Sequence, residues 1–462
     1  MPSRRQFIKA SAAGLLGAGL FRPEIGDAGL PPFELIASNG QAVFGDDQEN
    51  ATRVMYYNQS IPGPIIRIPQ GKESVIRLQN SLDEPTSVHW HGLRIDNAMD
   101  GVPDVTQLPV LPGEQFEYRF TPPDAGTYWY HTHMRSWAQL ARGLAGVLIV
   151  TEENPPRVDQ DLVFAIDDWR LDRNMRIDTA SFGSMHDWSH GGRLGNFITV
   201  NGDSEPNFEV AGGERIRLRL LNIANARIMN LLFNEPGISV IALDGQPVEP
   251  FTPDAGRIVL APGQRTDLII DMTSAPGSST AIELVIGEYA YEIANFTYRP
   301  EIRREQLLET PIRLPDNPAN KIVLPTEFKH VPLRMQGGAM GGMRSAQFEG
   351  REMDIRELVR HKKVWALNGL VGMPSEPLFR VKRGTAISLD VHNDNSWPHA
   401  MHIHGHHFVD DRNPGWWRDT ILFQRGEHGA MRFLADNPGK WLIHCHMVEH
   451  MAGGMLTWFE VT

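Results

Sequence analysis

The tripeptide His444-Cys445-His446, followed by His450 and Met455, combines residue types that bind copper. Cys445 is the only cysteine of the chain, so it has no intrachain disulfide partner. One thiolate, two imidazoles and a weakly bound thioether form the ligand set of a blue-copper electron-transfer site. This stretch therefore predicts a mononuclear copper site near the C-terminus.

The same tripeptide can face two centres if it lies in a β-strand. Successive side chains of a strand point to opposite faces, so His444 and His446 would share one face and Cys445 would point to the other. The strand would then be a short covalent connection between an electron-accepting copper and a second centre held by histidines.

Four His-x-His pairs occur at equivalent places in two parts of the chain. They are His89 with His91, His131 with His133, His402 with His404, and His444 with His446. His89 and His402 lie nine residues after Asn80 and Asn393, and His131 and His444 lie five residues after Gly126 and Gly439. Alternation puts both histidines of a pair on one face of a strand. Eight imidazoles can therefore converge where the two parts meet, and eight imidazoles could hold three coppers.

His399 breaks this pattern. It lies three residues before His402, so in a strand it faces the side of Cys445. We expect His399, Cys445, His450 and Met455 to complete the mononuclear site.

An internal repeat predicts the architecture. Three segments of equal length run from a turn glycine to a turn asparagine: Gly71–Asn80, Gly213–Asn222 and Gly384–Asn393. Each alternates apolar and polar residues, which is typical of a strand bounded by turns. Repetition at domain-sized spacing predicts three copies of one β domain, and short strands with frequent Gly and Pro favour Greek-key sandwiches or barrels. The middle copy has Leu231-Leu232-Phe233 where the others carry histidines.

The chain of 462 residues has room for about three domains of ~150 residues each. We predict an export signal over residues 1–29 and β domains over residues 30–155, 156–300 and 301–462. The formal charge of −12 argues against non-specific binding of nucleic acid.

The N-terminus carries a targeting pattern. Ser3-Arg4-Arg5-Gln6-Phe7-Ile8-Lys9 precedes an apolar run, 10–21, that has the size of a signal region and is too short to span a bilayer. We expect export by the twin-arginine machinery, with a periplasmic location. No later segment is apolar enough to cross a membrane, so we expect no stable membrane insertion.

The complete set of motifs resembles the three-domain multicopper oxidases over essentially the whole mature chain. The family pattern His-x-His-Gly, His-x-His, His-x-x-His-x-His-Gly and His-Cys-His-x-x-x-His-x-x-x-x-Met is present. The resemblance implies an all-β fold of three tandem cupredoxin domains and four copper ions: one type 1, one type 2 and two type 3.

The resemblance also implies a role for each ligand. His399, Cys445, His450 and Met455 would bind the type 1 copper, and His89 with His402 the type 2 copper. His91, His131 and His446 would bind one type 3 copper, and His133, His404 and His444 would bind the other.

Proton supply follows the family only in part. Asp100, nine residues after His91, matches the family's acidic residue near the type 2 copper and is our candidate proton relay. Bacterial members often carry a second acid directly after the last type 1 histidine, where this chain has Met451. Glu449 lies on the other side of His450, so the second proton donor stays open.

The electron donor also stays open. A laccase-like oxidase would take electrons from phenols or aromatic amines and pass them to dioxygen. A cuprous oxidase for copper tolerance would take them from Cu(I), and the Gly/Met segment with Met335, Met340 and Met343 offers soft ligands for that ion. Alternatively, the segment is a flexible loop with chance methionines, or its methionines pack adaptably around an organic substrate. A non-enzymatic relative on the same scaffold would have lost ligands, and none is lost here.

Overall fold

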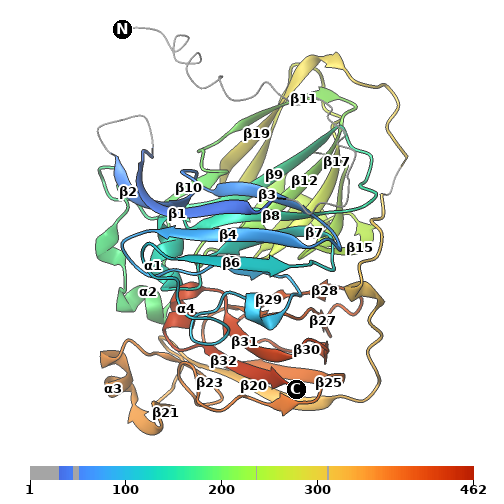
Figure 1. The fold of residues 1–462 in the computed structure, drawn as a ribbon. Helices are drawn as coiled ribbons and strands as arrows, with labels where there is room; N and C mark the ends of the chain where they lie inside the picture. The colour runs from blue at the N-terminus through green and yellow to red at the C-terminus, as the bar shows by residue number, and fades with distance from the viewer. Residues whose placement is uncertain (1–30, 45–50, 236, 310–311) are drawn as a thin grey trace. The chain divides into compact units, whose positions relative to one another are not determined.

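The computed structural model describes residues 31–44, 51–235, 237–309 and 312–462. These residues form an all-β fold of three tandem cupredoxin-like parts, each built from two main sheets (Figure 1). The predicted signal over residues 1–29 lies outside the described residues, so it stays a prediction. The predicted boundaries near residues 155 and 300 also stay predictions.

The first part contains two four-stranded sheets. In sheet order they are β2 (Thr52–Tyr57), β1 (Phe33–Ala42), β4 (Ser74–Ser81) and β6 (Gln115–Phe120), then β3 (Gly63–Pro69), β8 (Ala145–Thr151), β7 (Gly126–His131) and β5 (His89–His91).

The middle part contains a six-stranded and a five-stranded sheet. The first orders β10 (Phe197–Val200), β9 (Gln160–Trp169), β12 (Arg215–Asn222), β17 (Arg265–Asp271), β14 (Ile238–Leu243) and β15 (Gln246–Phe251). The second orders β11 (Asn207–Gly212), β19 (Tyr289–Ile302), β18 (Ser279–Ile286), β13 (Met229–Phe233) and β16 (Arg257–Leu260).

The third part, orange to red in Figure 1, repeats this plan. Its six-stranded sheet orders β23 (Trp365–Leu367), β20 (Lys329–Gly337), β25 (Thr385–Asn393), β30 (His428–Ala435), β27 (Phe408–Asp410) and β28 (Trp417–Arg418). Its five-stranded sheet orders β24 (Arg380–Val381), β32 (Leu456–Val461), β31 (Gly439–Cys445), β26 (His399–Ile403) and β29 (Thr420–Phe423). A separate hairpin pairs β21 (Ser345–Phe348) with β22 (Arg351–Asp354).

Helices are short and lie in the connections between strands. The α-helices are α1 (Ser136–Gln139), α2 (Met185–Ser189), α3 (Ile355–Arg360) and α4 (Val448–Ala452). The 3-10 turns are η2 (Asn97–Met99), η3 (Leu140–Arg142), η4 (Thr179–Ser181), η5 (Asp254–Gly256) and η6 (Ala319–Lys321). Among the described residues, no helix is long and apolar enough to cross a membrane.

One strand topology recurs in the three parts. β4, β12 and β25 each pair parallel with the strand before them in sheet order, which is β1, β9 or β20, and antiparallel with the strand after them. These central strands contain the alternating segments of the sequence, and their inward residues enter three separate apolar cores.

The asparagine that ends each of these strands has the same role in all three parts. The side-chain amides of Asn80, Asn222 and Asn393 donate to backbone carbonyls of the following loops, and their side-chain oxygens accept from the backbone N–H two residues later. All three side chains are buried. Asparagine suits the site because it has both donors and an acceptor, so it satisfies loop groups that would otherwise be buried without partners.

Candidate metal centres

β31 presents its alternate residues to two different environments. Its last residues pair with β26, with Cys445 opposite Met401 and His444 opposite His402. Cys445 packs into the apolar core of the third part. His444 lies instead among the imidazoles of His133, His402 and His404. The strand alternation that the sequence predicts is therefore present.

Cys445 forms a three-residue group with His399 and His450. Its Sγ lies 3.6 Å from Nδ1 of His399 and 3.7 Å from Nδ1 of His450, and the two nitrogens are 3.0 Å apart. Ligands bound at 2.0–2.3 Å around a trigonal ion are themselves about 3.5 Å apart. The three atoms therefore fit around one copper ion.

The remaining ring nitrogens of this group hold the imidazoles in place. Nε2 of His399 contacts the side-chain oxygen of Asn395 at 3.0 Å, and Nε2 of His450 contacts the carbonyl of His190 at 2.6 Å. Met455 is fully buried, and its backbone carbonyl accepts from the N–H of Cys445. Because both imidazoles donate outward through Nε2, both present the lone pair of Nδ1 inward, as metal binding requires.

Burial sets the protonation states of this group. It raises the pKa of the Cys445 thiol to about 12 and lowers the pKa of His450 to about 4. A thiol in this environment ionises only beside a strong cation, and a neutral imidazole is ready to bind one.

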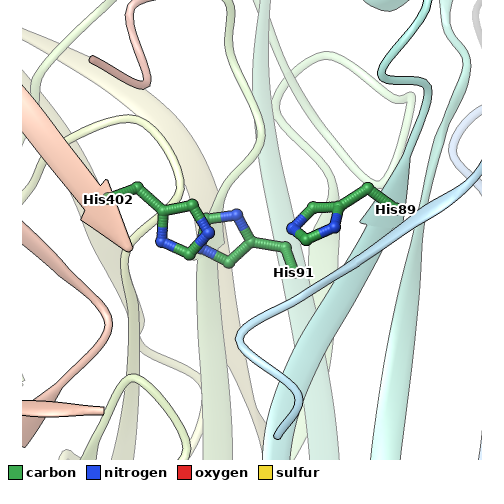
Figure 2. A group of neighbouring side chains, drawn as sticks. All are labelled: His89, His91 and His402. Carbon is green, nitrogen blue, oxygen red and sulfur yellow. The ribbon is translucent and has the colours of Figure 1, made fainter. Parts of the chain in front are cut away.

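The eight histidines of the four pairs converge in a second group. The structure brings together His89, His91 and His402, whose rings appear in Figure 2; His91, His131 and His446; and His133, His404 and His444. Within each set, candidate ligand atoms lie within 4.8 Å of one another. These sets join the first part of the chain to the third, because β5 and β7 supply one half and β26 and β31 the other.

The inward nitrogens of this second group have no protein partner. Among the described residues, Nε2 of His89, His131, His133 and His402, Nδ1 of His91 and both nitrogens of His446 are buried without a hydrogen bond. Nε2 of His404 faces Nε2 of His444 at 3.0 Å. A buried polar atom without a partner costs about 1–3 kcal/mol, and a shared set of metal ions would satisfy one such nitrogen on each ring. The residues present therefore fit the copper cluster that the motifs imply.

Outward hydrogen bonds select which nitrogen faces the cluster. Nδ1 of His89 contacts the carbonyl of Asp100 and Nδ1 of His402 that of Asp419, both at 2.8 Å, which leaves Nε2 inward. His91 is reversed, because its Nε2 contacts the Asp419 carboxylate at 3.1 Å and its Nδ1 is free. Desolvation by burial lowers the pKa of His91, His131 and His402 well below the usual value, so these imidazoles are neutral and able to bind a metal.

Asp100 lies against both halves of the cluster. Its Oδ2 is 2.8 Å from Nδ1 of His404, and its Oδ1 is 3.3 Å from Nδ1 of His89. The carboxylate follows η2 and is buried. Gly101 allows this approach, because a Cβ at its φ of +81° would lie 1.7 Å from the carbonyl oxygen of Val88.

Sequence reasoning missed a second buried carboxylate, Asp419, and its partner Arg265. Arg265 donates to both oxygens of Asp419, at 2.8 and 2.6 Å, and all of these atoms are buried. Although burial alone would raise the pKa of Asp419, Arg265 and His91 hold it well below its usual range. Arg265 belongs to the middle part, which carries no histidine of the cluster. The available signal was an acid between two short strands, β28 and β29, just before the apolar run Ile421-Leu422-Phe423.

Gly263 also brings the middle part of the chain close to the clustered histidines. A Cβ at this position would lie 3.0 Å from ring atoms of both His91 and His446. The loop that contains Gly263, together with Arg265 at the start of β17, therefore forms part of the wall around the clustered histidines, and only glycine fits at its nearest point.

A cavity of about 480 Å³ reaches the other side of the cluster. His133 lies in its wall together with Met134, Trp137, Asp104 and Met451. Met451, which stands where the family often has an acid, thus borders the same space as a predicted ligand. Glu449 is buried elsewhere: its Oε1 accepts from Asn225 at 2.9 Å, and burial raises its pKa to about 7.

The three methionines of the Gly/Met segment do not share one environment. Met335 lies in β20 and is fully buried in the third core, so its suggested role as a ligand for incoming ions is wrong. Met343 packs against a small cluster near β21, whereas Met340 is 79% exposed. The alternation of Val331, Leu333 and Met335 in β20 was the sequence signal for this burial.

Comparisons with known proteins agree with this geometry. Multicopper oxidase family models match residues 40–155, 160–280 and 349–462. The structure of Lac15 from a marine microbial metagenome is 36% identical, with a TM-score of 0.75 over 93% of this chain and 100% of that one. A multi-copper oxidase from Pseudomonas thermotolerans is 30% identical, with a TM-score of 0.81 over 94% and 100%. The multicopper oxidase MmcO of Mycobacterium tuberculosis is 29% identical over 87% of this chain and 82% of its own. The chain therefore belongs to the multicopper oxidase family and is an oxidoreductase with copper cofactors.

Proposed function

We propose that the protein takes single electrons from a donor at a type 1 copper and reduces dioxygen to water at a cluster of three coppers. His399, Cys445, His450 and Met455 would hold the first ion, and the eight paired histidines would hold the cluster. The observation that carries this proposal is the alternation of β31, since Cys445 meets one ligand group while its neighbours His444 and His446 meet the other.

Copper, when bound, supplies one-electron redox chemistry, and its four ions together match the four electrons that dioxygen takes up. The protein supplies distance and orientation. Cys445 is joined to His444 and His446 by single peptide units, so the path between the two groups is covalent and short. The surrounding core keeps water from the thiol, and the outward hydrogen bonds keep each imidazole in one tautomer.

Asp100 is our proposed proton relay. Its carboxylate contacts Nδ1 of His404 and lies near Nδ1 of His89, so it can hold a proton beside the cluster without binding a metal itself. On the other side of the clustered histidines, Asp104 is the carboxylate in the wall of the cavity that reaches His133. At position 451 itself, where the family often has an acid, the wall of this cavity has methionine.

The donor can be an organic molecule or Cu(I), and one observation favours Cu(I). His450 is fully buried, and its Nε2 is already bonded to the carbonyl of His190. A phenol therefore cannot contact the imidazole that usually receives electrons at the edge of such a site. A small cation needs no such pocket. The twin-arginine pattern in the sequence supports export to a periplasm, where protection against copper is needed.

Oxygen uptake with two donors tests this function. The copper-loaded protein should consume dioxygen with Cu(I) as the donor, and more slowly with a bulky dimethoxyphenol. Faster turnover of the phenol would restore the laccase-like function as the better description. Absence of oxygen uptake with either donor would contradict the proposal as a whole.

A further inference from the structure

Trp365, the first residue of β23, lies against both imidazoles of the group formed by His399, Cys445 and His450. Its ring centroid is 4.4 Å from that of His450 and 4.9 Å from that of His399, with the planes inclined by 42° and 83°. The side chain is fully buried in the core that also contains Cys445. One indole therefore contacts two histidines that come from different elements, β26 and α4.

Three contacts fix this indole in place. Its Nε1 donates to the carbonyl of Trp188, in α2, at 2.6 Å. The backbone N–H of Trp365 donates to the carbonyl of Gly453, directly after α4, at 3.1 Å. A Cβ at Gly338 would clash with the six-membered ring of the indole, so only glycine lets the loop after β20 approach so closely. Trp365 thus joins three separate segments around the mononuclear group.

The hydrogen bonds of the two imidazoles do not orient them fully. Nε2 of His399 bonds to the side-chain oxygen of Asn395, and Nε2 of His450 bonds to the carbonyl of His190. In an imidazole, Nε2 lies close to the axis about which the ring turns on its Cβ–Cγ bond, and this torsion has only broad intrinsic preferences. A bond at Nε2 therefore leaves the direction of Nδ1 loosely set, and contact with the indole restricts the turn of both rings.

The indole also fills space next to a cavity. Trp188 and Ala452 border the cavity of about 480 Å³, and Trp365 bonds to Trp188 and to the residue after Ala452. Trp365 therefore separates part of the cavity wall from the imidazoles of His399 and His450, and a smaller side chain would leave a gap there that water can enter. The apolar shell around a metal site controls solvent access and, through it, the redox potential.

We propose that Trp365 is a positioning residue of the type 1 site: its indole holds His399 and His450 in their ligand orientations and keeps water from the copper that they share with Cys445. This inference rests on the proposed function, because it requires copper at these three residues. Water beside the ion stabilises the more highly charged Cu(II) form relative to Cu(I). Loss of the indole therefore lowers the reduction potential of the type 1 copper.

Trp441 provides a matched control in the same core. It is also fully buried, and its Nε1 donates to a backbone carbonyl, that of Asn437, at 2.9 Å. Its ring lies 5.7 Å from that of His406, which is not a candidate ligand. Trp441→Leu removes the same side-chain volume as Trp365→Leu from this core, at a ring that packs on His406 instead. Trp365→Phe is the conservative variant, because it keeps a flat ring at position 365 and loses the Nε1 donor.

Redox titration and electron paramagnetic resonance of the copper-loaded proteins measure the effect. Trp365→Leu should shift the one-electron equilibrium of the type 1 copper about ten-fold towards Cu(II), which corresponds to a potential lower by about 59 mV. The blue absorption should weaken and the copper hyperfine splitting should widen, because a water ligand moves the ion towards the tetragonal geometry of ordinary Cu(II). Trp365→Phe should shift the equilibrium in the same direction by less. Trp441→Leu should lose thermal stability to a similar degree and keep the wild-type potential and spectrum.

The outcomes separate this role from the function it serves. Wild-type potential and spectrum in both Trp365 variants would overturn the role of Trp365, even if the wild type is blue and reduces dioxygen. An equal shift in Trp441→Leu would show a general effect of lost packing and would overturn it too. If Trp365→Leu does not fold, Trp365→Phe decides, since an unchanged potential there overturns the role. A colourless wild type would contradict the proposed function, and the role of Trp365 with it.

Discussion

β13 in the middle part and β26 in the third part occupy the same place in their sheets, yet their side chains have different roles. β13 lies between β18 and β16, and β26 lies between β31 and β29. At the same offset from the repeat asparagine, β13 carries Leu231 and β26 carries His402. Leu231 fills the apolar core of the middle part, whereas His402 faces the cluster. The cupredoxin scaffold alone therefore makes no metal site, and ligands appear only where side chains supply them.

The middle part still reaches the cluster by another route. Gly263, in the loop before β17, lies against the rings of His91 and His446, and Arg265, the first residue of β17, bonds Asp419. In our proposal the flanking parts supply the copper ligands, and the middle part supplies a positioning charge. Four changes test this division of roles.

Removing the thiolate should have the largest effect. Cys445→Ser should abolish the blue colour and donor oxidation, because Cys445 is the only cysteine of the chain and so the only source of a thiolate for the first group. The cluster should remain, since its eight histidines are untouched, and copper content should fall by one ion per chain. Visible absorption measures the blue colour, and metal analysis measures the copper content. Loss of all copper would mean that the two groups are not separate sites.

Replacing Asp100, the buried acid of the first part, should have the next largest effect. Asp100→Asn should slow reoxidation by dioxygen about 10²–10³-fold, because a positioned proton donor contributes about that much. Anaerobic bleaching by the donor should keep its wild-type rate, since Asp100 touches only the cluster. Stopped-flow measurement of the two half-reactions separates them. Equal slowing of both would remove Asp100 from proton transfer.

The middle part is tested through Arg265. Arg265→Gln leaves Asp419 buried without its cation, so the His91 ring loses its fixed support. Copper affinity of the cluster should fall about 10–100-fold while the blue colour remains. Arg217→Gln is the control, because Arg217 is equally buried and bonds Asp267 at 2.7 Å on the same sheet.

Both arginine variants should lose stability, by about 3–5 kcal/mol for a broken buried pair. The Arg265 change alone should release copper from the cluster. Arg265→Lys should recover part of the binding through its charge. If the two arginine variants lose copper equally, the middle part acts through folding alone.

The smallest effect concerns acid stability of the middle part. The hydrogen bond from Arg304 lowers the pKa of Asp159 to about 2, against the opposing effect of burial. Because the folded pKa lies below the unfolded value of 3.8, the pair stabilises the fold above pH 3.8, and this contribution disappears as the pH falls towards 2. Arg304→Gln should reduce stability at neutral pH by about 1 kcal/mol and narrow the difference from wild type at acid pH. A constant difference between pH 6 and 3 would contradict this.

Much of the fold and the ligand groups could be predicted because their signals are local. The Gly-to-Asn repeats mark three strands, and a His-x-His pair fixes which faces its side chains share once the strand is recognised. Cys445 and His450 likewise lie at the end of one strand and in the short helix after it, β31 and α4, whereas His399 comes from the neighbouring strand β26.

Other features depend on contacts between distant segments, which spacing does not encode. Asp419 and Arg265 are 154 positions apart and meet only in the folded chain. His190 and His450 are 260 positions apart, so the bond from His450 to the carbonyl of His190 was invisible in the sequence. Met335 shows the conflict between two signals: its residue type suggested a ligand, whereas its alternation with Val331 and Leu333 is typical of a buried strand position. The apolar core determined its place.

Copper content and spectra of the purified, copper-loaded protein test the central claim most directly. If β31 joins two centres through Cys445 and its neighbouring histidines, the protein binds four coppers per chain. It is then intensely blue from the thiolate-bound ion, and its electron paramagnetic resonance spectrum contains one type 1 and one type 2 signal. A colourless protein, or one that binds a single copper, would contradict the account.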